Sequence, residues 1–169
     1  MELEKKLLGG DLRSVGAVED IVKNVKNQTQ FDRLFKIMSG SNRLLQMRSI
    51  DAVEKITLHY PEYLVPHKNK IIEWTNKQQN IEFKWHLALL LSRLELNTEE
   101  LKATYKTLKS WALEKSESKI VRVNSIQALH ELTDHYNLDK EELMDIFGKI
   151  KTERIPSLNA RIKHLIVTP

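Results

Sequence analysis

Apolar residues recur every three or four positions along most of this chain, which is the spacing of amphipathic helices. The clearest stripe lies within residues 43–60 and consists of Leu44, Met47, Ile50, Val53 and Ile56. Turn signals, such as the segment SGSN at residues 39–42 and Pro61, separate the helical stretches. The pattern predicts helices over about residues 12–27, 28–38, 43–60, 67–77, 81–94, 98–115, 119–136, 139–151 and 156–166.

One short helical phrase returns along the chain at a nearly constant interval. The related segments begin at Ala17, Ala52, Ala88 and Ala128, so the intervals are 35, 36 and 40 residues. A period of about 20 to 50 residues is typical of solenoids, in which each unit buries its apolar face only against its neighbours. The sequence therefore predicts an all-α fold, a right-handed α-α superhelix of about four helical hairpins. The predicted hairpins cover residues 12–39, 43–78, 81–115 and 119–151, and a terminal helix covers residues 156–166.

The paired helices resemble HEAT-type repeats of the armadillo-like superfamily. The best match covers residues 46–75, with Arg48 in its first helix. A second copy begins at Arg122, whereas residues 84–86 (KWH) replace the arginine region in the repeat between them. The resemblance implies a single repeat domain over residues 1–169, and it implies a scaffold that binds a partner along its concave face.

The composition restricts the kinds of site that this chain can contain and the compartment that suits it. The 169-residue chain has no cysteine, which excludes disulfides, thiolate metal sites and cysteine nucleophiles and fits a reducing cytoplasm. The N-terminal segment lacks the apolar core of a signal peptide, and no apolar run approaches the roughly 18 residues of a membrane-spanning helix. The net charge of +4 permits an acidic protein or a nucleic acid as partner. We therefore expect a cytoplasmic protein without membrane contact.

Patterns that would bind a metal or a cofactor fail on spacing. His130 and His135 are five positions apart, about 140° around a helix, whereas two zinc ligands on one helix face are four positions apart. The pair Gly9-Gly10 is not followed by the lysine of a phosphate-binding loop. The acidic cluster at residues 139–145 lacks the alternating ligands and the glycine of a calcium loop. We expect no metal, no cofactor and no catalytic residue.

A run of lysines on one predicted helix is the best candidate for a binding surface. Lys102, Lys106 and Lys109 are spaced by four and by three positions, so they share one helix face. Lys70 lies in the second helix of the preceding predicted hairpin, and the resemblance implies that second helices line the concave side. Trp85 stands between two polar residues and is a candidate aromatic anchor. The predicted partner-binding residues are Lys70, Trp85, Lys102, Lys106 and Lys109.

Two functions fit this lysine strip. The first, which is our expectation, is a non-catalytic scaffold or adaptor that binds a protein partner. The alternative is nucleic-acid binding, because a row of lysines attracts phosphates with an affinity that falls steeply as salt rises. Some DNA glycosylases that remove alkylated bases are built from HEAT-like repeats, and in such an enzyme Glu73, beside Trp74, would be the best candidate for the required carboxylate.

Overall fold

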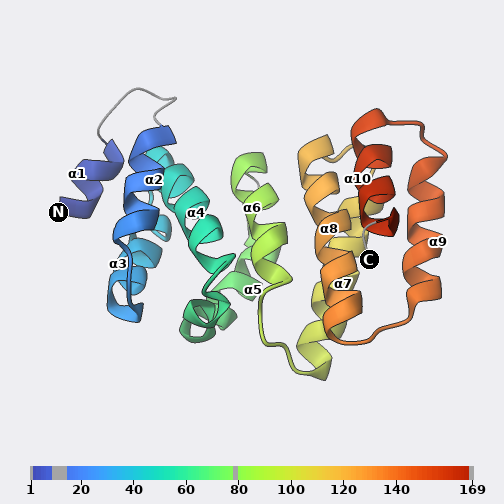
Figure 1. The fold of residues 1–169 in the computed structure, drawn as a ribbon, viewed down its shortest axis with the longest axis horizontal. Helices are drawn as coiled ribbons and strands as arrows, with labels where there is room; N and C mark the ends of the chain where they lie inside the picture. Colours follow the sequence, from blue (N-terminus) through green and yellow to red (C-terminus); the bar gives the residue numbers. More distant parts are fainter. Residues whose placement is uncertain (1, 9–14, 78–79, 168–169) are drawn as a thin grey trace. The chain divides into compact units, whose positions relative to one another are not determined.

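The computed structural model describes residues 2–8, 15–77 and 80–167. Within these ranges the chain is all-α, as predicted, and contains no strand (Figure 1). None of the described helices is both long enough and apolar enough to cross a membrane. The helices are α1 (Glu2–Leu8), α2 (Val15–Asn24), α3 (Gln28–Met38), α4 (Arg43–Thr57), the 3-10 helix η1 (Pro61–His67), α5 (Lys68–Lys77), α6 (Ile81–Leu91), α7 (Thr98–Leu113), α8 (Lys119–His135), α9 (Lys140–Lys151) and α10 (Pro156–Val167).

The predicted helices are found with small differences at their ends. α3 has the predicted bounds, whereas α4 ends at Thr57 rather than near residue 60. Pro61 then begins η1, because proline lacks an N–H and its fixed φ suits the first position of a helical turn. The sequence pattern did not predict η1 or the short helix α1. Residues 12–14 of the predicted first helix lie outside the described residues.

Side-chain caps fix where several helices begin. The Asn97 side chain accepts a hydrogen bond from the Glu100 backbone N–H, and the Glu100 carboxylate accepts one from the Asn97 N–H, both at 2.9 Å. This reciprocal capping box satisfies two donors at the start of α7 that would otherwise lack partners. Single side-chain caps of the same kind begin α3, α4, α6 and α9, at Asn27, Asn42, Asn80 and Asp139.

The chain divides into two compact units, residues 1–68 (unit 1) and residues 69–169 (unit 2). In unit 1, α4 packs against α1, α2, α3 and η1. Arg48 is buried on α4 and donates a hydrogen bond to the backbone oxygen of Leu7, which tethers α1 to α4. α4 is therefore the central helix of unit 1.

A histidine holds η1 against α3 in unit 1. The His67 ring stacks on Phe35, with the ring centroids 3.8 Å apart, and His67 Nε2 lies 2.7 Å from Asp32 Oδ1. Asp32 Oδ1 also accepts a hydrogen bond from Gln28 Nε2. These two hydrogen bonds, that from Gln28 most of all, hold the pKa of the Asp32 carboxyl below its usual value. The contacts with Gln28 and His67 therefore favour the ionised form of the Asp32 carboxyl.

In unit 2, α8 is the central helix and packs against α6, α7, α9 and α10. The helices α6, α8 and α10 form one layer, because α8 lies between the other two. The helix α7 lies behind α8 in the view of Figure 1 and contacts α9. Both α6 and α7 therefore pack on α8. The right-handed superhelix over the whole chain stays a prediction.

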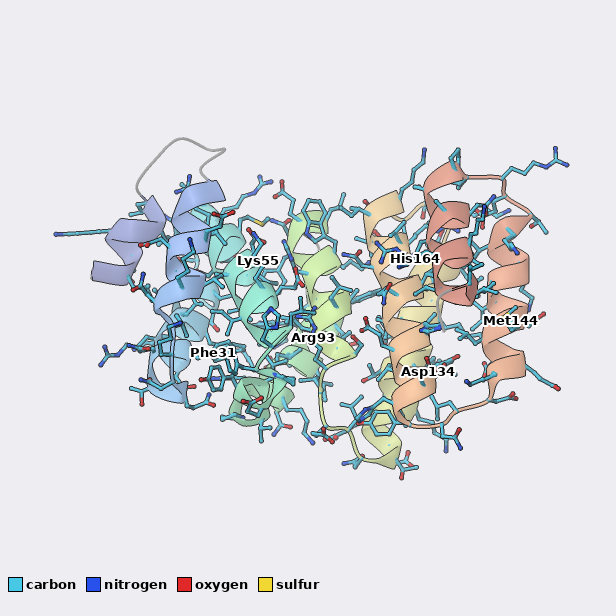
Figure 2. All side chains as sticks on the ribbon, viewed as in Figure 1. Phe31, Lys55, Arg93, Asp134, Met144 and His164 are labelled. Carbon is cyan, nitrogen blue, oxygen red and sulfur yellow. The ribbon has the colours of Figure 1, made fainter. Side chains whose placement is uncertain are left out.

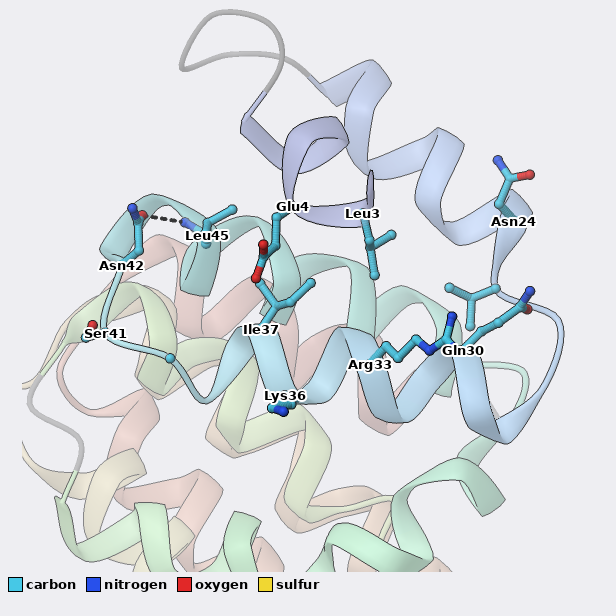
Figure 3. Close-up of a pocket in the computed structure, with 12 residues that line it drawn as sticks. Leu3, Glu4, Asn24, Gln30, Arg33, Lys36, Ile37, Ser41, Asn42 and Leu45 are labelled. Carbon is cyan, nitrogen blue, oxygen red and sulfur yellow. Dashed lines mark hydrogen bonds between the residues drawn. The ribbon is translucent and has the colours of Figure 1, made fainter. Parts of the chain in front are cut away.

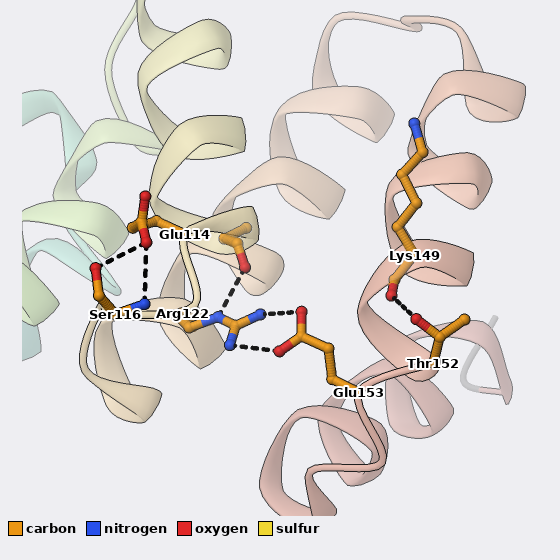
Figure 4. A network of polar contacts seen from close by, with 7 residues as sticks. Glu114, Ser116, Arg122, Lys149, Thr152 and Glu153 are labelled. Atoms are coloured by element: carbon orange, nitrogen blue, oxygen red, sulfur yellow. Dashed lines mark hydrogen bonds and ion pairs between the residues drawn. The ribbon is translucent and has the colours of Figure 1, made fainter.

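A buried ion pair joins three parts of unit 2 (Figure 4). Arg122 on α8 is 1% exposed, and its Nε donates a hydrogen bond to the Ala112 backbone oxygen of α7 at 2.9 Å. Its two terminal nitrogens donate to the two carboxylate oxygens of Glu153, just after α9, at 2.9 and 2.7 Å. A forked pair of this kind fixes both the distance and the orientation of the groups it joins. We call this set of contacts the Arg122 clamp.

A related ion pair joins α6 to the segment after α7, at the position where the sequence departs from the expected arginine. Lys84 on α6 makes an ion pair with Glu117, which follows α7, and both side chains are largely buried. The Lys84 ammonium also lies 4.7 Å from the centroid of the Trp111 ring. In both cases a cation on one helix, α6 or α8, therefore binds a carboxylate that follows the next helix in the chain, α7 or α9.

We expect Arg122→Leu to lower the free energy of unfolding by about 3–5 kcal/mol, because it leaves the largely buried Glu153 carboxylate and the Ala112 carbonyl without their donor. Urea denaturation followed by circular dichroism measures the change. The control is Lys149→Gln, which breaks the exposed Lys149–Asp145 ion pair and should cost less than about 1 kcal/mol. Equal losses in the two variants would contradict the role given to the clamp.

The clamp also predicts a dependence of stability on pH. Hydrogen bonds from Arg122 lower the pKa of Glu153, although burial acts in the opposite direction. The contribution of Glu153 is therefore fully present above the pKa of an unfolded-chain glutamate, about 4.3, and is lost as the pH falls through the lower pKa of the folded protein. Urea denaturation across a pH series should show the wild-type chain losing its advantage over Glu153→Gln below about pH 4. An advantage that does not change with pH would count against this account.

Candidate functional site

The outer face of α7 is the candidate binding surface. The helix turns Thr104, Leu108 and Trp111 into the core of unit 2, where all three are buried. Lys102 and Lys106 lie on the opposite side and are exposed. Lys109 lies beside them and is partly exposed. The predicted spacing thus brings three lysines onto one face, which we call the α7 lysine face (Lys102, Lys106 and Lys109).

The three lysines differ in their partners. Lys109 Nζ lies 2.5 Å from Glu142 Oε1 on the neighbouring helix α9. The hydrogen bond with Glu142 raises the pKa of Lys109 and outweighs the opposite effect of its limited burial. Lys102 and Lys106 make no ion pair with any of the residues that the structure describes. The unneutralised charge of the face therefore belongs mainly to these two lysines.

Negative charge on α9 limits the basic surface to α7. Glu141, Glu142 and Asp145 are all exposed on that helix. Glu142 binds Lys109, and Asp145 lies 2.7 Å from Lys149 on the next turn of α9. The surface of α7 therefore carries a short row of positive side chains, and the neighbouring surface of α9 carries side chains of both signs.

Lys70, the fourth predicted lysine, is engaged on its own helix. Its Nζ lies 3.1 Å from Glu73 Oε2, and Glu73 also pairs with Lys77. These two lysines, Lys77 most of all, hold the pKa of Glu73 below its usual value. Trp74, next to Glu73, is 7% exposed and packs edge-on against Phe83, so its ring is not presented to a ligand. A carboxylate beside an open aromatic ring, as a glycosylase would need, is therefore not formed at this pair.

Trp85, the predicted anchor, lies on α6 and not on α7. It is half-buried on α6, and its backbone oxygen accepts a hydrogen bond from Asn124 of α8 at 2.9 Å. Among the described residues, no hydrogen bond, ion pair or ring contact connects Trp85 with the α7 lysine face. The structure does not bring the predicted anchor and the predicted lysines into one site.

The two histidines with incorrect zinc spacing have separate neighbours. His130 Nδ1 lies 3.5 Å from Asp134 Oδ2, whereas the His135 ring packs edge-on against Tyr136 with centroids 4.6 Å apart. Asp134 also lies 3.3 Å from the ammonium of Lys140. The carboxylate nearest to His130 is thus shared with a lysine.

Unit 1 contains a cavity of about 700 Å³ that was not predicted, and α1, α3 and the start of α4 line it together. Arg33 and Lys36 of α3 contribute positive charge to its wall. No sequence signal marks such a cavity, because its lining residues are far apart in the chain and α1 was not predicted.

No family model, no curated protein and no solved structure matches this chain. The resemblance to HEAT-type repeats therefore stays a prediction.

The partners of the lysines predict different reactivities toward an amine-acylating reagent. We expect Lys102 and Lys106 to react faster than Lys109, because the raised pKa of Lys109 leaves less of its amine in the reactive neutral form. Glu142→Gln should accelerate labelling of Lys109, and the neighbouring change Glu141→Gln should not. Peptide mass spectrometry over a time course measures each rate. Equal effects of the two variants would show that Glu142 does not hold Lys109 in solution.

Proposed function

We propose that this chain is a non-catalytic scaffold or adaptor that binds an acidic protein surface through the α7 lysine face. The observation that carries the proposal is the pair Lys102 and Lys106, two exposed lysines without a carboxylate partner among the described residues. Each could pair with a carboxylate of the partner without breaking an existing ion pair. Lys109 can join them when Glu142 yields its place to a carboxylate of the partner.

The helix that carries these lysines is well fixed. The capping box at Asn97 and Glu100 holds its start, and Leu108 and Trp111 anchor its inner side in the core. Residues four apart on a helix lie one above the other, about 5–6 Å between Cβ atoms, so Lys102 and Lys106 match two carboxylates one turn apart on a partner helix. A fixed row of charges of this kind steers association and selects the partner more than it adds affinity.

The wider architecture is part of the same proposal. We propose that the hairpins belong to a HEAT-type, right-handed superhelix in the cytoplasm, with α7 as a second helix on its concave side. The parallel ion pairs of Lys84 with Glu117 and of Arg122 with Glu153 support a repeating unit, since each joins a first helix to the end of the same hairpin. The lack of cysteine supports a location in the reducing cytoplasm.

Nucleic acid is the alternative ligand, because the row of lysines on α7 would attract phosphates. A phosphate backbone needs a continuous positive track, because each neutralised phosphate adds to the affinity. The exposed carboxylates of Glu141, Glu142 and Asp145 on α9 interrupt such a track beside α7. The same carboxylates do not hinder a partner helix that contacts α7 alone. An acidic protein is therefore the preferred partner.

We expect Lys102→Glu/Lys106→Glu to lose its protein partners, because the charge reversal repels an acidic surface. Affinity capture from the source cell, quantified by mass spectrometry, identifies proteins that the wild-type chain retains. Titration of a purified partner should then show at least about a tenfold loss of affinity, mostly as slower association. The matched control is Lys149→Glu/Lys151→Glu on α9, which reverses two exposed lysines and should retain the partners.

Nucleic-acid binding is tested with a fluorescently labelled DNA duplex and a fluorescently labelled single strand, at low and at physiological salt. Binding that persists at physiological salt and disappears in Lys102→Glu/Lys106→Glu would make nucleic acid the ligand. Protein partners that the α7 variant retains as well as the α9 control does would remove the α7 lysine face from consideration.

A further inference from the structure

The cavity in unit 1 has an apolar body. Its volume is about 700 Å³, within the range of roughly 300–1,000 Å³ that is usual for sites of small organic ligands. Leu3 of α1, Ile37 of α3 and Leu45 of α4 line it from three elements, and Val25 adds a further apolar surface beyond the end of α2. An apolar ligand group placed here would lose contact with water on several sides.

Charged groups divide the cavity into two ends. Figure 3 shows Arg33 lying along α3 toward Gln30, whereas Glu4 of α1 points toward Ile37, away from the Arg33 guanidinium. Arg33 and Lys36 are exposed on α3 and make no ion pair within the described part of the chain. The end of the cavity near Arg33 and Gln30 is therefore positive, and no carboxylate of the lining occupies it.

We propose that this cavity binds a small amphiphilic carboxylate. Its apolar body would lie against Leu3, Val25 and Ile37, and its carboxylate would bind the Arg33 guanidinium, whose parallel N–H groups match two carboxylate oxygens. Lys36, one turn further along α3, adds positive potential without the forked geometry. A cationic head group at this end would meet the two positive side chains, so this end of the cavity selects an anionic head group.

The position of α1 couples this site to the packing of unit 1. α1 supplies Leu3 to the cavity, and its end is held on α4 by the hydrogen bond from Arg48 to the Leu7 backbone oxygen. A ligand that binds only the folded arrangement stabilises it in proportion to its affinity and its concentration. The occupied cavity should therefore fix α1 on α3 and α4.

The test is calorimetric titration of the full chain with dodecanoate below its micelle concentration, and with dodecyltrimethylammonium as a probe of the same chain length and opposite charge. We expect dodecanoate to bind and the cationic probe to bind at least about tenfold more weakly. Arg33→Gln should weaken dodecanoate binding at least about tenfold, and Lys36→Gln should weaken it less. Ile37→Asp should weaken it too, by placing a carboxylate in the apolar wall.

The matched control is Lys102→Gln/Lys106→Gln, which removes two exposed lysines from unit 2 and should leave dodecanoate binding unchanged. Arg33 and Lys36 are exposed, so their replacement does not disturb the core, and circular dichroism verifies the fold of each variant. Failure of dodecanoate to bind, equal affinity for both probes, or unchanged affinity in Arg33→Gln would each overturn the proposal. None of these results bears on the α7 lysine face, which lies in the other unit.

Discussion

The arrangement of unit 2 depends on one buried guanidinium. Arg122 leaves water almost completely, and the cost of that transfer is offset only because its donors meet the Ala112 carbonyl and both oxygens of Glu153. The three contacts join α8 to the end of α7 and to the residues after α9. A shift of α9 away from α8 would separate the buried charges of Arg122 and Glu153, and a shift of α7 would leave the Ala112 carbonyl without its donor. Lys84 and Glu117 form a similar ion pair between α6 and the segment after α7.

The two candidate sites, the α7 lysine face and the cavity in unit 1, present positive charge in different ways. On α7, two lysines stand on an exposed helix face with flexible stems and present point charges to a large surface. In unit 1, an arginine borders an open, partly apolar cavity and presents a planar fork to a small anion. The residue type, the curvature of the surface and the nearby carboxylates together separate a macromolecular partner from a small ligand. Net charge by itself would not have made that distinction.

Local spacing predicted what depends on local interactions. The stripe Phe31, Leu34, Phe35 and Met38 is buried in a helix of the predicted length, and the spacing of Lys102 and Lys106 correctly predicted that they share one helix face. Contacts between distant segments were not predictable in this way. Glu142 follows Lys109 by 33 residues, and only the packing of α9 on α7 brings their side chains together.

The three tryptophans of this chain, Trp74, Trp85 and Trp111, all lie in unit 2, so unit 1 contains none. Two of them are buried and the third is half-buried, so unfolding of unit 2 moves each ring toward water. Unit 1 instead carries the stacked tyrosines Tyr60 and Tyr63. Tryptophan fluorescence excited at the red edge of the absorption band, where tyrosine does not absorb, therefore reports the unfolding of unit 2 alone. The loss of the helical circular dichroism signal reports the unfolding of both units. A difference between the two melting curves would measure how far the units unfold independently.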